Sequence, residues 1–132
     1  MMNQYQAQCS CQQLSLVAEA EPVRVSLCHC LACQRRTGST YGVQARFPAD
    51  KVRISGRHTE FQRRGDSGST ASFCFCPVCG ATVFFRLEQQ PDLIGVPVGV
   101  LADPQFPQPS VSVYEEYQHP WVVLPDAIEH YD

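Results

Sequence analysis

The sequence lacks several features that would assign it to a common functional class. No apolar run approaches the roughly 20 residues needed to cross a membrane, so we expect no membrane partner. The net charge is −3 and neither sign forms a long run. A basic stripe typical of nucleic-acid-binding proteins is therefore missing, and we expect no nucleic-acid partner. There is also no serine triad, phosphate-binding glycine loop or paired carboxylate.

The first residues also lack the pattern of a secretion signal. The first residues, MMNQYQAQCSC, have neither a charged n-region nor an apolar h-region. We therefore expect a cytoplasmic protein, and stable disulfides are rare in that reducing compartment. The eight cysteines then need another role, and metal binding is the leading one.

Short apolar runs separated by turn residues predict a mainly β, antiparallel fold. The length and the absence of a linker predict a single domain over residues 1–132. The only helical turn expected is Leu31–Arg36, and the proline-rich chain from Pro91 onward predicts edge strands and surface loops. The predicted strands are Gln13–Glu19, Val23–Cys28, Tyr41–Phe47, Lys51–Ser55, Thr59–Arg63, Ala71–Phe75, Ala81–Leu87, Leu93–Val100 and Val111–Tyr117.

Three cysteine clusters have the spacing of metal ligands: CSC at residues 9–11, CHCLAC at residues 28–33 and CPVCG at residues 76–80. Residues i and i+2 of an extended segment share a face, so a C-x-C pair can offer two sulfurs to one ion. Gly80 permits the positive φ that a C-x-x-C corner often needs.

The cluster sizes predict two zinc ions. The first and third clusters together supply four thiolates, enough for a closed structural site: Cys9, Cys11, Cys76 and Cys79. The middle cluster supplies three, which leaves one position open as in a catalytic site: Cys28, Cys30 and Cys33. The alternatives are one metal with the remaining thiols free, or a redox C-x-x-C pair.

Two residues beside these clusters need separate interpretations. Cys74 forms a C-x-C pair with Cys76 and could replace it, but a small buried residue in a strand is the preferred interpretation. His29 lies between two candidate ligands and, on an extended segment, faces away from them. We therefore expect a surface or hydrogen-bonded histidine rather than a ligand.

The run CHCLACQRRTGS at residues 28–39 resembles the signature of the glutathione-dependent formaldehyde-activating enzyme family, the CENP-V/GFA domain. The flanking segments fit in the same order: Cys9–Cys11, Asp66–Gly68, Phe75–Gly80, Val98–Pro104 and Pro120–Asp126. The resemblance implies an Mss4-like β fold and the same division into two zinc sites. It also implies a carbon–sulfur lyase that joins glutathione to formaldehyde.

A zinc ion held by three thiolates could bind an incoming thiol as thiolate, which could then attack an aldehyde carbon. Arg35 and Arg36 directly follow the cluster, where one could offset negative charge and one could grip a substrate carboxylate. The predicted catalytic residues are therefore Cys28, Cys30, Cys33, Arg35 and Arg36. The alternative is a non-catalytic zinc scaffold that binds a protein partner, with its second site closed by Cys74 or a histidine.

Overall fold

A computed structural model describes residues 3–65 and 68–131, and over these residues the chain is mainly β, as predicted. The described residues form one α-helix, α1 (Leu31–Thr37), and three short 3-10 helices, η1 (Ala49–Lys51), η2 (Val98–Leu101) and η3 (Glu115–Tyr117). The strands are β1 (Tyr5–Gln8), β2 (Ser15–Ala18), β3 (Arg24–Cys28), β4 (Gly42–Pro48), β5 (Val52–Ser55), β6 (Thr59–Arg64), β7 (Thr70–Phe75), β8 (Thr82–Leu87), β9 (Leu93–Pro97), β10 (Val111–Val113) and β11 (Glu129–Tyr131).

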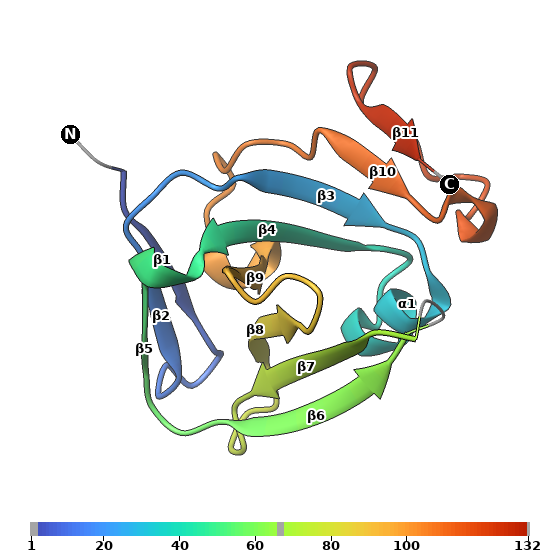
Figure 1. Cartoon of the computed structure of the whole chain (residues 1–132). Helices are drawn as coiled ribbons and strands as arrows, with labels where there is room; N and C mark the ends of the chain where they lie inside the picture. The colour runs from blue at the N-terminus through green and yellow to red at the C-terminus, as the bar shows by residue number, and fades with distance from the viewer. Residues whose placement is uncertain (1–2, 66–67, 132) are drawn as a thin grey trace.

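The strands form two sheets. The smaller has the order β1-β2-β5, and the larger has the order β11-β10-β3-β4-β9-β8-β7-β6. Most neighbours are antiparallel, whereas β10 runs parallel to both β3 and β11. The large sheet curves, so that β3 and β4 lie opposite β6 and β7, with α1 at one end of the space between them (Figure 1). No helix in the described part of the chain is long and apolar enough to cross a membrane.

The C-terminal third differs from the sequence-based prediction. Leu93–Pro97 is not an edge strand, because β9 lies between β4 and β8 and buries Ile94 and Val96. Pro97 is tolerated because it ends the strand. The apolar run continues as η2, and the predicted strand from Val111 ends early and is followed by η3. The strands β1 and β11 were not predicted.

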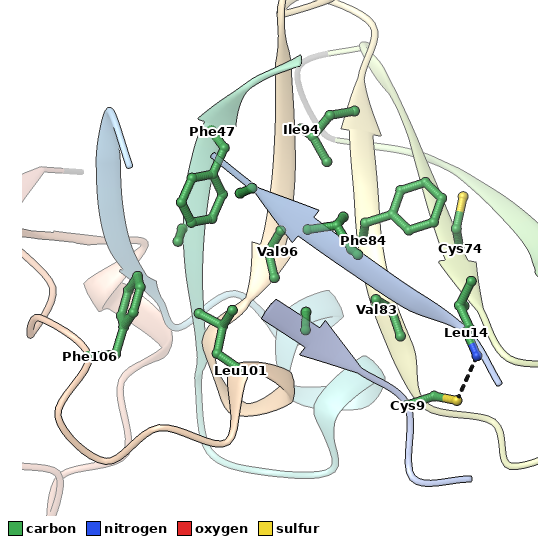
Figure 2. Close-up of a cluster of buried hydrophobic side chains, with 14 of the residues drawn as sticks. Cys9, Leu14, Phe47, Cys74, Val83, Phe84, Ile94, Val96, Leu101 and Phe106 are labelled. Carbon is green, nitrogen blue, oxygen red and sulfur yellow. Dashed lines mark hydrogen bonds between the residues drawn. The ribbon is translucent and has the colours of Figure 1, made fainter. Parts of the chain in front are cut away.

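The main core lies where the two sheets meet. Figure 2 shows Phe47, Phe84, Ile94 and Val96 packed together, and all four are among the fully or almost fully buried residues. Cys9 lies at the edge of this core, where its sulfur accepts a hydrogen bond from the backbone N–H of Leu14 at 3.3 Å (Figure 2). The core thus supports one of the cysteine clusters directly.

The strands β3 and β4 present opposite chemistry on their two faces, because successive side chains alternate. Val25, Ala45 and Phe47 belong to the apolar core. The alternate positions form three cross-strand pairs that face away from it: Arg24 with Arg46, Ser26 with Gln44, and Cys28 with Gly42. This polar face carries one cysteine cluster.

A second, smaller apolar cluster lies on β7 and β8 and contains Ala71, Phe73 and Phe85. The rings of Phe73 and Phe85 have centroids 5.5 Å apart. Phe85 pairs with Gly95 of β9, and a Cβ atom at Gly95 would lie 2.1 Å from Cζ of the Phe85 ring. The ring therefore occupies the space that a side chain at position 95 would need.

Candidate metal centres and the adjoining pocket

Two turns from different sheets bring four cysteine sulfurs together. All four lie within 4.8 Å of one another: Cys9, Cys11, Cys76 and Cys79. The sulfur of Cys11 is 3.6 Å from that of Cys9 and 3.6 Å from that of Cys76. Zinc–sulfur bonds of about 2.3 Å in a tetrahedron place sulfurs roughly 3.8 Å apart. The spacing of these four residues, called the quartet below, therefore fits one zinc ion.

Each half of the quartet lies on a tight turn. The backbone N–H of Gln12 bonds to the carbonyl of Cys9 at 3.0 Å, and Gln12 has a φ of 72°. The backbone N–H of Gly80 bonds to the carbonyl of Cys76 at 2.9 Å, and Gly80 has a φ of 82°. The positive φ expected at Gly80 is therefore present, and it turns the chain so that both sulfurs of the second pair face the first pair.

The surroundings of Cys76 favour its charged form. Burial raises the pKa of this thiol, but the backbone N–H groups of Cys79 and Val78 and the amide of Gln13 donate hydrogen bonds to the sulfur. Together they lower the pKa of Cys76 to about 6. Cys11 and Cys79 are exposed, whereas Cys9 and Cys76 are buried. The quartet thus lies between the protein surface and the core, and the thiolate form is favoured at Cys76.

The middle cluster forms a second site at the junction of β3 and α1. The sulfurs of Cys28, Cys30 and Cys33 lie within 4.8 Å of one another, and we call these residues the trio. Cys30 is the N-cap of α1, and its sulfur accepts the backbone N–H of Cys33 at 3.3 Å. Gly38 ends the helix with a φ of 71°, a left-handed conformation that glycine adopts without strain. Among the described residues, no fourth His, Cys, Asp or Glu joins the trio.

The three sulfurs cannot all carry a negative charge without a cation. Hydrogen bonds from the thiols of Cys28 and Cys33 lower the pKa of Cys30. The hydrogen bonds that Cys28 makes with Cys30 and with Cys33 raise the pKa of Cys28. The pKa of one thiol is thus lowered and those of the other two are raised, so the cluster disfavours three thiolates at once. A divalent cation would remove this conflict, and the all-sulfur donor set suits zinc.

The trio lies in the wall of a pocket of about 660 Å³. The pocket is strongly basic: its lining contains five arginines, Arg24, Arg35, Arg46, Arg63 and Arg64. No Asp or Glu occurs among the lining residues that the structure describes. The elements that supply the arginines are β3, β4 and β6 together with α1, so the pocket occupies the space enclosed by the curved sheet.

The two arginines predicted to act at the trio occupy different positions. Arg35 is exposed and lines the pocket. Arg36 is half-buried, lies over the ring of Phe73 at 5.2 Å and opposes the rise in the pKa of Cys33. Arg63 lies over the same ring at 4.9 Å and helps to lower the pKa of Cys30, after the larger effect of the neighbouring sulfurs.

Cys74 and His29 both lie outside the two sulfur clusters. Cys74 is 2% exposed in the main core, as expected for a small buried residue, and burial raises its pKa to about 11. His29 is fully buried, and its Nε2 lies 3.0 Å from the hydroxyl oxygen of Ser112. The hydrogen-bonded alternative for His29 therefore holds, and the surface alternative does not.

Sequence reasoning missed four of the five arginines that line the pocket: Arg24, Arg46, Arg63 and Arg64. A signal for Arg24 was present, because Arg24, Ser26 and Cys28 alternate along one strand and therefore share a face. No local pattern identifies Arg46 or Arg63, because their approach to the trio depends on how the sheet curves. The Asp66–Gly68 turn noted in the sequence lies partly outside the described residues.

Comparisons with known proteins give a family match and a structure of similar fold. Residues 4–117 match the family described as "Glutathione-dependent formaldehyde-activating enzyme". A solved structure of a Rhodobacter sphaeroides protein superimposes with a TM-score of 0.56 at 22% identity, covering 76% of this chain and 92% of that chain. At that identity the likeness shows a shared fold. No curated protein matches the sequence.

Proposed function

The chain belongs to the glutathione-dependent formaldehyde-activating enzyme family, and from this premise we propose that it is a zinc-dependent carbon–sulfur lyase. In the proposed reaction, the sulfur of a small thiol such as glutathione forms a bond to the carbon of a small aldehyde such as formaldehyde. The thiol proton ends on the aldehyde oxygen, which gives a hydroxymethyl thioether. The reverse reaction breaks the carbon–sulfur bond and returns the proton to sulfur.

The observation that carries this proposal is the position of the trio in the wall of the basic pocket. Three thiolates are available for one ion there, and the described residues supply no fourth ligand of the usual types. Catalytic zinc sites in proteins have three protein ligands and leave a position for substrate. Cys28, Cys30 and Cys33 would hold the zinc, and the pocket would hold the thiol and the aldehyde.

Zinc bound at the trio would favour the thiolate form of a substrate thiol near neutral pH. Three ligand thiolates with one dication leave a net charge of −1, so a further thiolate needs cations nearby. The guanidinium groups of Arg36 and Arg63, which lie over the ring of Phe73, would supply these cations. Gln44 donates a hydrogen bond to the Cys33 sulfur at 3.6 Å, which holds that ligand in place.

The quartet has a different proposed role. Its four thiolates leave no position for a substrate, so Cys9, Cys11, Cys76 and Cys79 would hold a structural zinc ion. This ion would join the turn after β1 to the turn after β7.

The alternative function, a non-catalytic zinc scaffold for a protein partner, requires a closed second site. The sequence offered Cys74 or a histidine as the closing ligand. Cys74 belongs to the main core and neither it nor His29 joins the trio, which supports the enzyme over the scaffold.

The test combines metal content with turnover. We expect the purified protein to contain two zinc ions per chain and to form the hydroxymethyl thioether from formaldehyde and a thiol, followed by NMR exchange spectroscopy. Cys30→Ala should lose one zinc and at least 100-fold in turnover, while its circular dichroism spectrum is retained, because removal of a metal ligand removes the metal's contribution. Full turnover by Cys30→Ala would exclude the trio as the reaction centre.

A further inference from the structure

The strand β6 ends the larger sheet, and no strand in the described part of the chain pairs with its outer side. In Figure 1 it lies along the lower margin of the molecule, with β7 on its inner side. All its residues are exposed except Arg63, which is half-buried. The strand at the opposite end of the sheet, β11, is only half as long. An exposed strand edge presents backbone N–H and C=O groups that can pair with another strand.

The hydrogen bonds between β6 and β7 show which backbone groups of β6 face outward. The backbone N–H of Gly65 donates to the carbonyl of Ser69 at 2.8 Å, which closes the turn between the two strands. Along an antiparallel strand, the backbone groups of successive residues point alternately to one neighbour and to the other. Counting back from Gly65 in steps of two, the groups of residues 63, 61 and 59 face β7. The outward groups therefore belong to the alternate residues, Glu60, Gln62 and Arg64.

These outward groups are spaced so that β6 can pair with β6 of a second copy. Antiparallel pairing about a two-fold axis at Gln62 places this residue opposite its own equivalent. The same axis places Glu60 opposite Arg64 of the second copy. All three outward-facing residues then exchange backbone hydrogen bonds across the interface, as paired residues of an antiparallel sheet do.

The side chains of β6 favour this register over its neighbour. Glu60 and Arg64 carry opposite charges, and two-fold symmetry makes this attractive pair twice. On the other face of the sheet, Arg63 lies opposite Phe61 of the second copy. Phe61 is 60% exposed, and a guanidinium over an aromatic ring is a favourable contact. A two-fold axis at Phe61 would instead place Glu60 opposite Gln62 and lose both ion pairs.

We propose that two copies of this chain form a symmetric dimer in which their β6 strands pair antiparallel around Gln62 and join the two large sheets. Arg63 lines the pocket beside the trio, so Phe61 of the second copy lies next to a residue of the pocket wall. Each copy thereby contributes an aromatic side chain beside the other's pocket. One short strand from each copy makes a small interface, typical of weak complexes that bury less than about 1,200 Å². Dimer formation therefore depends on protein concentration.

Exchange of the charged residues tests the pairing directly. Sedimentation velocity of the full chain, from micromolar to submillimolar concentration, should show a monomer that converts to a dimer. Glu60→Arg and Arg64→Glu should each weaken the dimer by at least about tenfold, because two attractive pairs become two repulsive ones. An equal mixture of the two variants should form a heterodimer, because every opposed pair then joins an arginine to a glutamate.

Two further variants separate net charge from backbone pairing. Arg53→Glu makes the same charge change as Arg64→Glu, but on β5 of the smaller sheet, so it should form the dimer as the parent does. Gln62→Pro removes an N–H group that faces away from β7, and proline is tolerated at such positions of edge strands. It should lose the dimer, whereas Gln62→Ala should keep it. The melting temperature of each variant shows that the monomer remains folded.

Three outcomes would overturn the inference. A parent protein that stays monomeric at every concentration would exclude a second copy and leave this edge to a strand of a different protein. A dimer that persists in Glu60→Arg, Arg64→Glu and Gln62→Pro would form through another surface. Charge variants that remain monomeric when mixed would exclude the register centred on Gln62. None of these measurements depends on turnover, so the dimer and the proposed reaction are tested separately.

Discussion

The amide nitrogen of Gln13 donates a hydrogen bond of 3.0 Å to the sulfur of Cys76, which lies 63 residues later in the chain. The same nitrogen donates to the carbonyl of Arg57 at 2.7 Å, and the Gln13 side-chain oxygen accepts the backbone N–H of Arg57 at 3.0 Å. One side chain thus links the first cysteine turn, the turn before β6 and a cysteine of the quartet. It also contributes to the lowered pKa of Cys76.

Removal of this side chain should weaken metal binding at the quartet. Hydrogen-bond donors to metal ligands typically contribute about 10- to 100-fold in metal affinity. We therefore expect the zinc affinity of Gln13→Ala, measured by competition with a chelator, to fall by about that factor. Gln13→Glu should be worse, because it places a negative charge beside a thiolate. Gln6→Ala, at an exposed position of β1, is the control. Equal metal retention in all four proteins would show that the hydrogen bond has no such role.

The two sulfur clusters should differ in their effect on folding. Cys79→Ser should lower the melting temperature far more than Cys33→Ser, because a structural zinc ion contributes on the order of 10 kcal/mol to folding. Cys79 is exposed, so the change removes little packing, and Val78→Ala on the same turn is a suitable control. Thermal unfolding with zinc analysis makes the comparison. Equal losses of stability would contradict the division into a structural and a catalytic site.

Cys74 should matter for packing and not for metal. Cys74→Ser places a hydroxyl in the apolar core, which costs about 1–3 kcal/mol when the group finds no partner, whereas Cys74→Ala should lose less. Both variants should keep two zinc ions per chain, and urea denaturation measures the stability. A lost zinc ion in both variants would restore Cys74 as a ligand.

Gly95 should resist even a methyl group. Gly95→Ala forces the ring of Phe85 to move, and overpacking of this kind typically costs about 1–3 kcal/mol. Phe85→Leu in the same chain should recover part of the loss. Gly99→Ala is the matched control, because nothing lies within 4 Å of the position its Cβ would take. Stability measured by urea denaturation should rank Gly99→Ala above the double variant and Gly95→Ala lowest.

Local sequence patterns predicted most of the strands because each alternates or is bounded by turn residues. The strand predicted over Leu93–Val100 was too long, because β9 ends at Pro97 and a 3-10 helix follows it. Both segments are apolar, so composition alone does not show where the strand ends. The three residues of β11 are all exposed, so no burial pattern marks them. They form a strand because β10 offers a free edge, which is a property of the assembled sheet.

In the candidate site, too, some features follow from local sequence and others depend on the assembled sheet. The two cysteine groups were proposed from spacing within short segments, and the sulfurs of each group lie within 4.8 Å of one another. Arg36 could be placed beside the trio because it follows Cys33 by three residues on one helix. Arg46 and Arg63 could not, because only the curvature of the large sheet brings β4 and β6 to one pocket.

The trio comes from six consecutive positions, whereas the quartet joins Cys11 to Cys76 across most of the sequence. During synthesis, residues 28–33 leave the ribosome well before Cys76 is added, and no long loop has to close for them to meet. The trio is therefore the first of the two groups that can assemble during synthesis. The quartet cannot assemble until β7 and the turn after it have been made, so the order of the cysteines along the chain is also the order in which the two groups can form.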